Sequence, residues 1–121
     1  MLPSALYRPS LALLTDLYQL TMVQGYWKLG RQDDEAVFHL SFRKAPFGGG
    51  YTIAAGLAPA VDWMTSLRFS EEDRAYLLSL KAADRSALFE PAFVAWLGEQ
   101  TLRLDVDAVA EGTVVFPHEP L

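Results

Sequence analysis

The sequence predicts an α+β domain in which a small, incomplete sheet is covered by helices. Its 121 residues suffice for one core and are too few for two domains, and 51% of them are hydrophobic. Apolar residues recur at helical spacing in one early stretch and in a run of stretches in mid-chain. Alternating stretches follow the first helix and lie near the C-terminus. The order is therefore helix, strand, a run of helices, then strand.

The first regular element is expected to be a helix over Asp16–Leu29, closed by Gly30. Residues 1–12, with two prolines, are expected to be an extended lead-in to a domain of residues 13–121. Two apolar ridges merge into a wide stripe on this helix: Tyr18, Met22, Tyr26 and Leu29, beside Leu20, Val23 and Trp27. The remaining polar strip is narrow and consists of Thr21, Gln24 and Lys28. Such a helix packs against more than its own sheet, and a second subunit is one candidate.

The clearest strand is predicted over Glu35–Arg43, where apolar residues alternate with a second face. One face holds Phe38, Leu40 and Phe42, and the other holds Val37, His39, Ser41 and Arg43. The loop of residues 43–51 combines a proline with three glycines that permit positive φ angles. This loop is expected to make a tight excursion.

Three more helices are predicted in mid-chain, followed by a strand. Apolar residues repeat at helical spacing from Leu57 to Leu67, and Ser70 with Asp73 has the spacing of a capping box for a helix through Leu80. Pro91 suits the first turn of a helix that runs to about Gln100. Residues 102–107 alternate, and Val109–Phe116 is predicted to be a strand ended by Pro117. Two or three such strands leave edges that need partners, so the chain is expected to belong to a longer protein.

Composition excludes several classes of function. A net charge of −5 with scattered basic residues argues against nucleic-acid binding. The absence of cysteine excludes disulfides, thiolate nucleophiles and cysteine-ligated metals, and His39 and His118 are isolated, so no metal site is expected. No apolar stretch approaches the roughly 20 residues of a membrane span, so a cytoplasmic protein is expected.

Few residues could carry chemistry on their own. Asp16 and Tyr18 begin a helix, where the dipole favours an acceptor, although an N-cap followed by a core tyrosine is the simpler interpretation. Arg43 and Lys44 precede the glycine-rich loop and could meet a phosphate there, although a solvated pair of cations is more common. Glu111 stands in an apolar stretch, where it either has a partner or faces water.

Three stretches are specific when they are taken together in order: residues 13–22 (LLTDLYQLTM), 42–51 (FRKAPFGGGY) and 111–121 (EGTVVFPHEPL). With these motifs the chain resembles the N-terminal domain of nicotinate phosphoribosyltransferase from about Leu13 to Leu121. The resemblance implies an enzyme of NAD biosynthesis that forms nicotinate mononucleotide from nicotinate and phosphoribosyl pyrophosphate, with ATP hydrolysis and magnesium. Such an enzyme works by positioning its substrates and stabilising charge.

The resemblance also implies roles for the four candidate residues. It implies a homodimer in which Tyr18 of one subunit lies against the pyridine ring in the site of its mate, supported by Asp16. It places Arg43 against phosphate or pyrophosphate, with Lys44 beside it. It assigns no catalytic residue and no metal ligand to these 121 residues.

The fold that the resemblance implies is the N-terminal domain of a type II phosphoribosyltransferase. Members continue into an irregular α/β barrel that supplies the phosphoribosyl-binding loop and the histidine phosphorylated by ATP. Neither is present in this chain, which alone is therefore expected to be inactive. Two alternatives stay open: a sister enzyme that uses nicotinamide or quinolinate, and a free-standing, non-catalytic module for dimerisation or ligand sensing.

Overall fold

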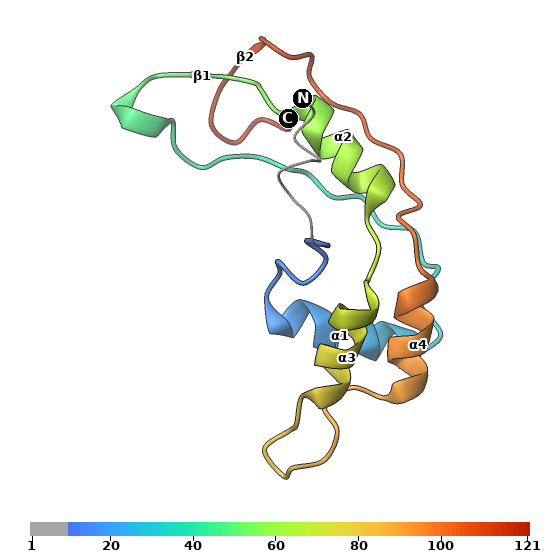
Figure 1. The fold of residues 1–121 in the computed structure, drawn as a ribbon. Coiled ribbons are helices and arrows are strands. Elements are labelled where there is room, and N and C mark those ends of the chain that lie inside the picture. Colours follow the sequence, from blue (N-terminus) through green and yellow to red (C-terminus); the bar gives the residue numbers. More distant parts are fainter. Residues whose placement is uncertain (1–9) are drawn as a thin grey trace.

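The computed structural model describes residues 10–121, so most of the expected lead-in, residues 1–9, lies outside the described residues. Figure 1 shows a curved molecule with a helical cluster at one end and a short hairpin at the other. The elements in chain order are α1 Leu17–Lys28, the 3-10 turn η2 Pro46–Gly48, β1 Thr52–Ile53, α2 Leu57–Ser66, α3 Glu71–Ser79, α4 Pro91–Glu99 and β2 Val114–Val115. Helices with one small antiparallel sheet confirm the α+β class.

All four predicted helices are present, and their ends match the sequence signals. Asp16 is the N-cap of α1, and Gly30 follows its end with a φ of 68°. The capping box of α3 is reciprocal: the Asp73 N–H donates to Ser70 Oγ at 3.0 Å and the Ser70 N–H to Asp73 Oδ2 at 2.8 Å. Pro91 occupies the first position of α4, where no N–H is needed.

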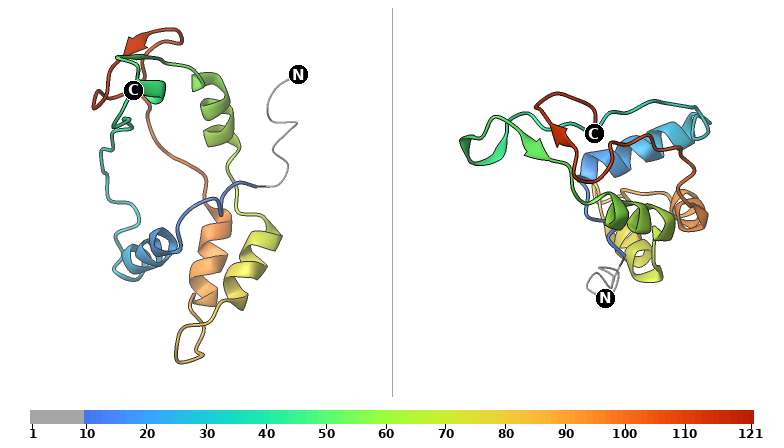
Figure 2. Two further views of the ribbon diagram at one scale, coloured as in Figure 1. Left: turned by 90° about the vertical axis from the view of Figure 1, so that its left-hand side faces the viewer. Right: turned by 90° about the horizontal axis from the view of Figure 1, so that it is seen from above.

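The core lies in the helical cluster of α1, α3 and α4. Its buried residues are Leu20, Leu77, Phe89, Phe93, Val94 and Leu97. Phe93 is fully buried and packs against Trp27 of α1, with ring centroids 5.8 Å apart. Because α3 and α4 bury their apolar faces against each other and α1, they do not cover the sheet, and that part of the prediction is wrong. Figure 1 and the left-hand view of Figure 2 show the hairpin at one end of the molecule and these helices at the other.

The strand predicted over 35–43 is absent, and the one predicted over 109–116 is shortened to Val114–Val115. β1 and β2 pair in antiparallel register, Thr52 with Val115 and Ile53 with Val114. Within the stretch 109–116, only Val114 and Val115 form a strand. Neither residues 35–43 nor residues 102–107 form one. A strand exists through the hydrogen bonds it makes with a neighbour, and residues 35–39 make no backbone–backbone hydrogen bond with the described part of the chain.

Gln24, in the polar strip of α1, is buried, whereas Lys28 of the same strip is exposed. Gln24 is only 8% exposed, and its Nε2 donates to the Leu88 carbonyl at 3.1 Å while its Oε1 accepts from the Glu90 N–H at 2.7 Å. Lys28 Nζ lies 2.5 Å from Glu90 Oε1. Gln24 therefore fastens α1 to the segment that leads into α4 and satisfies two backbone groups there.

Candidate functional site

The first candidate site lies at the N-terminal end of α1. Asp16 caps the helix, and its N–H donates to Gln19 Oε1 at 3.0 Å. The Thr15 hydroxyl donates to the same oxygen. Tyr18 is 59% exposed, so it is not a core tyrosine of this chain. The capping interpretation of Asp16 is confirmed, whereas the simpler interpretation of Tyr18 is wrong.

Tyr18 is one end of an exposed apolar surface that we call the α1 ridge. Its members, Tyr18, Met22, Tyr26 and Leu29, are all exposed. The other ridge of the helix lies on the core through Leu20, Val23 and Trp27. The two ridges that merge in the sequence thus face opposite environments, and the α1 ridge is left without a partner among residues 10–121.

The second candidate site is the pair Arg43 and Lys44, at a bend before η2. Both are exposed, and neither forms an ion pair with any described residue. In the excursion that follows, Phe47 and Gly48 have positive φ angles of 57° and 69°, so the predicted tight turn is confirmed there. The backbone beside Arg43 is held in place, because the Phe42 carbonyl accepts the His118 N–H at 2.8 Å.

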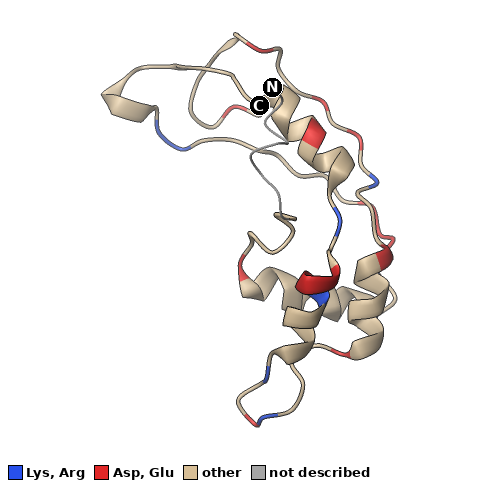
Figure 3. Ribbon diagram, viewed as in Figure 1, with Lys and Arg blue, Asp and Glu red and all other residues tan. Residues whose placement is uncertain are grey.

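The structure does not bring these two sites together within one chain. Figure 3 shows the two cations of residues 43–44 near the hairpin end, whereas α1 lies in the helical cluster. The views in Figure 2 also keep them apart. Within one chain, α1 and residues 43–44 therefore lie in different parts of the described structure.

Glu111 has a partner that sequence reasoning did not identify. Its carboxylate accepts the Gly56 N–H at 2.9 Å and the Leu57 N–H at 2.6 Å, so it caps α2 from a distance of more than fifty residues along the chain. The N–H groups and dipole at a helix N-terminus favour a negative charge. Gly56 itself has a φ of 109° and offers no side chain for the cap. No local spacing links residues 56 and 111, so no sequence signal could have paired them.

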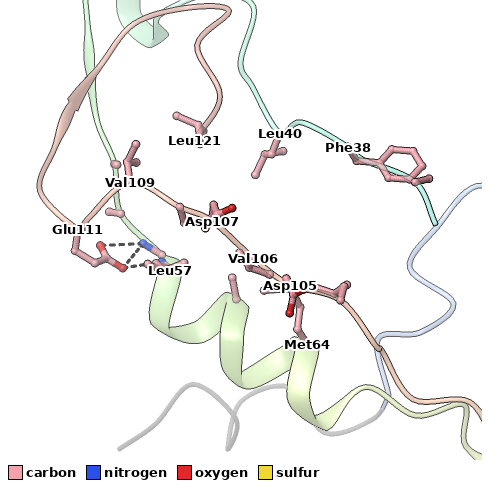
Figure 4. A pocket seen from close by; sticks show the side chains of 17 residues that line it. Phe38, Leu40, Leu57, Met64, Asp105, Val106, Asp107, Val109, Glu111 and Leu121 are labelled. Carbon is pink, nitrogen blue, oxygen red and sulfur yellow. Dashed lines mark hydrogen bonds between the residues drawn. The ribbon is translucent and has the colours of Figure 1, made fainter.

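An apolar cavity of about 460 Å³ lies between α2 and two extended segments, residues 36–40 and 104–109 (Figure 4). Leu57, Ala60 and Met64 line it from α2. Its charged lining residues are Asp105, Asp107 and Glu111, and no lysine, arginine or histidine lines it. None of the four predicted site residues lies on this cavity.

Two features are absent from residues 10–121. No group of three or more histidine, cysteine, aspartate or glutamate side chains in this part could hold a metal ion. No helix of this part is long and apolar enough to cross a membrane.

Comparison with known proteins gives one consistent result. A family model described as the nicotinate phosphoribosyltransferase N-terminal domain matches residues 13–121. The chain is 45% identical over 109 residues to nicotinate phosphoribosyltransferase pncB2 of Mycobacterium tuberculosis, covering 90% of this chain and 22% of that protein. It is 43% identical over 110 residues to the human nicotinate phosphoribosyltransferase and 42% identical over 112 residues to that of Caenorhabditis elegans, again over 90% of this chain, which is 20% and 19% of those proteins. The chain therefore spans about a fifth of the length of these relatives.

Proposed function

Because the chain belongs to the family of nicotinate phosphoribosyltransferase N-terminal domains, we propose that it is the N-terminal part of an enzyme that forms nicotinate mononucleotide from nicotinate and phosphoribosyl pyrophosphate. The observation that carries the proposal is the match of the family model from residue 13 to residue 121, together with relatives of that name. These relatives are not named for nicotinamide or quinolinate, so neither alternative acceptor is favoured.

The reaction that we propose joins the pyridine nitrogen to C1 of the ribose as the bond from C1 to pyrophosphate breaks. Positive charge develops on the ribose while negative charge grows on the leaving group, so the site needs fixed cations and a flat wall for the acceptor. Arg43 and Lys44 are free to serve as those cations, since no described carboxylate neutralises them. ATP hydrolysis and magnesium belong to the proposed full-length enzyme.

Tyr18 is proposed as the wall for nicotinate, with Asp16 setting the start of its helix. Its ring is exposed at the end of the α1 ridge, where an aromatic face is available to a ligand or a neighbouring subunit. The separation of Tyr18 from Arg43 in one chain supports a homodimer that shares its sites, with Tyr18 of one subunit serving the mate. The wider fold proposed is type II, with a barrel that follows this domain, and the enzyme is proposed to be cytoplasmic.

Steady-state kinetics of the full-length enzyme test these roles. Arg43→Ala should raise the Michaelis constant for phosphoribosyl pyrophosphate or ATP far more than that for nicotinate, because nicotinate carries no phosphate. Tyr18→Ala should do the reverse, since the loss of an aromatic stack costs about 1 kcal/mol. Equal effects of Arg43→Ala on all substrates, with lower thermal stability, would give Arg43 a purely structural role. Unchanged kinetics for Tyr18→Ala would remove it from the site.

A further inference from the structure

We propose that the cavity between residues 36–40 and 104–109 is the seat of an extended strand contributed by a part of the same polypeptide outside these 121 residues. The inference rests on the proposed function, which takes the protein to be about as long as its relatives. Those relatives are roughly four to five times the length of this chain. The surface proposed is therefore an internal interface of the full protein, distinct from the substrate residues Tyr18 and Arg43.

The first wall of the cavity already has the side-chain geometry of a strand. Ala36, Phe38 and Leu40 line the cavity, whereas Val37 and His39 between them do not. This period of two is that of extended backbone with one face turned to a core. Phe38 is nevertheless 90% exposed, so its face is not yet covered by the described residues.

The second wall of the cavity is also a backbone segment without hydrogen-bonded partners among the described residues. Residues 104–109 line the cavity from the other side, and Figure 4 shows this segment running past α2 opposite Phe38 and Leu40. Neither residues 35–39 nor residues 101–109 make a backbone–backbone hydrogen bond with the described part of the chain. Unpaired N–H and C=O groups along an extended segment are a template for another strand, and a peptide added there satisfies them.

At one end of the first wall, the backbone is already paired with residues 118–121. The Leu40 carbonyl accepts the Leu121 N–H at 3.0 Å, and the Phe42 carbonyl accepts the His118 N–H at 2.8 Å. Residues 118–121 thus occupy the edge at residues 40–42 and leave the edge at residues 35–39 free. An incoming strand has room only along the unpaired stretch.

Charge argues against a substrate as the occupant. The carboxylates of Asp105, Asp107 and Glu111 line the cavity with no basic side chain among the lining residues, so a phosphate or the carboxylate of nicotinate would be repelled. An apolar strand that carries a lysine or arginine at one end is complementary. A segment of the same chain is favoured over a second copy because tethering raises its effective concentration.

Hydrogen exchange of the full-length wild-type enzyme, followed by mass spectrometry, tests the inference without a mutation. Amides of residues 35–39 should exchange at least about a hundred-fold more slowly than in an unstructured peptide, at every protein concentration used. Exchange at the unprotected rate would show an open groove and overturn the proposal. Protection lost when the dimer is diluted to monomer would assign the cover to a second copy and overturn it as well.

A cysteine pair adds a control on which face is covered. Residues 1–121 contain no cysteine, so Phe38→Cys and Val37→Cys each place a single thiol in this domain, on opposite faces of one segment. The two side chains are similarly exposed here, at 90% and 85%. In the full-length enzyme, maleimide should label position 37 at least about tenfold faster than position 38. Equal labelling rates at positions 37 and 38 would refute the proposal that a strand occupies the cavity.

The two proposals fail separately in this protein. If the wild-type enzyme synthesises nicotinate mononucleotide while the amides of residues 35–39 exchange at the unprotected rate, only the proposal of a bound strand is refuted. Protected residues 35–39 in a protein that does not transfer a phosphoribosyl group would sink only the proposed function.

Discussion

Gln24 is predicted to stabilise the packing of α1 through its two hydrogen bonds to the segment that leads into α4. Gln24→Leu keeps the size of the side chain but removes both of its hydrogen bonds, so the Leu88 carbonyl and the Glu90 N–H lose their partner. A buried backbone group left without a partner costs about 1–3 kcal/mol, and two such groups cost roughly 2–4 kcal/mol after partial rehydration. This exceeds the effect expected from losing the Lys28–Glu90 ion pair, which is half-exposed and worth at most about 1 kcal/mol.

The Glu90 amide reports on this change directly, because its hydrogen is the one donated to Gln24. A loss of about 2 kcal/mol should speed its exchange roughly thirty-fold. Gln32→Leu, the same substitution at an exposed position, should leave the rate unchanged. An unchanged Glu90 rate in Gln24→Leu would refute the reasoning.

The remaining predictions concern local structure. Glu111→Ala should speed exchange of the Gly56 and Leu57 amides about fivefold, as expected for loss of a cap worth about 1 kcal/mol, and Glu111→Gln should do so less because it keeps one acceptor. Gly30→Ala should lower the free energy of unfolding by about 1 kcal/mol, measured with urea, because the φ of 68° is unfavourable for a residue with a Cβ. The Ser86 hydroxyl, followed by its N–H, lowers the pKa of Asp84 below 3.8, so the bond's contribution is present above that pH and is lost as pH falls through the lowered value. Ser86→Ala should raise the pKa of Asp84 toward 3.8 in a carboxyl-carbon NMR titration, and an unmoved pKa would contradict this assignment.

Helices were the part of the fold that the sequence predicts best, because their signals are local. The Ser70–Asp73 box and Pro91 lie within a turn of the ends that they specify, and a helix satisfies its own backbone. The strand over 35–43 failed for the opposite reason. Its alternation correctly identifies Phe38 and Leu40 as one face, but a strand also needs a neighbour, and alternation carries no information about a partner distant in sequence.

The candidate site divides in the same way. The sequence motifs predict Asp16, Tyr18, Arg43 and Lys44 as site residues, and the structure adds that all four are exposed. The burial of Gln24 could not be predicted, since helical spacing places this residue on a face without saying what lies opposite. The contact of Glu111 with α2 could not be predicted either, because it depends on the tertiary fold that brings Glu111 to the Gly56 N–H.

The proposed sharing of sites between subunits is tested most directly by mixing two variants of the proposed full-length enzyme. Tyr18→Ala and Arg43→Ala dimers, each weak alone, are dissociated, combined in equal amounts and reassociated, and synthesis of nicotinate mononucleotide is measured at limiting substrate. If Tyr18 serves the mate's site, each hybrid dimer holds one intact site, and the mixture should recover about a quarter of wild-type activity. If both residues serve the site of their own chain, every site in the hybrid carries one lesion. Activity no higher than the mean of the two variants would then contradict the account.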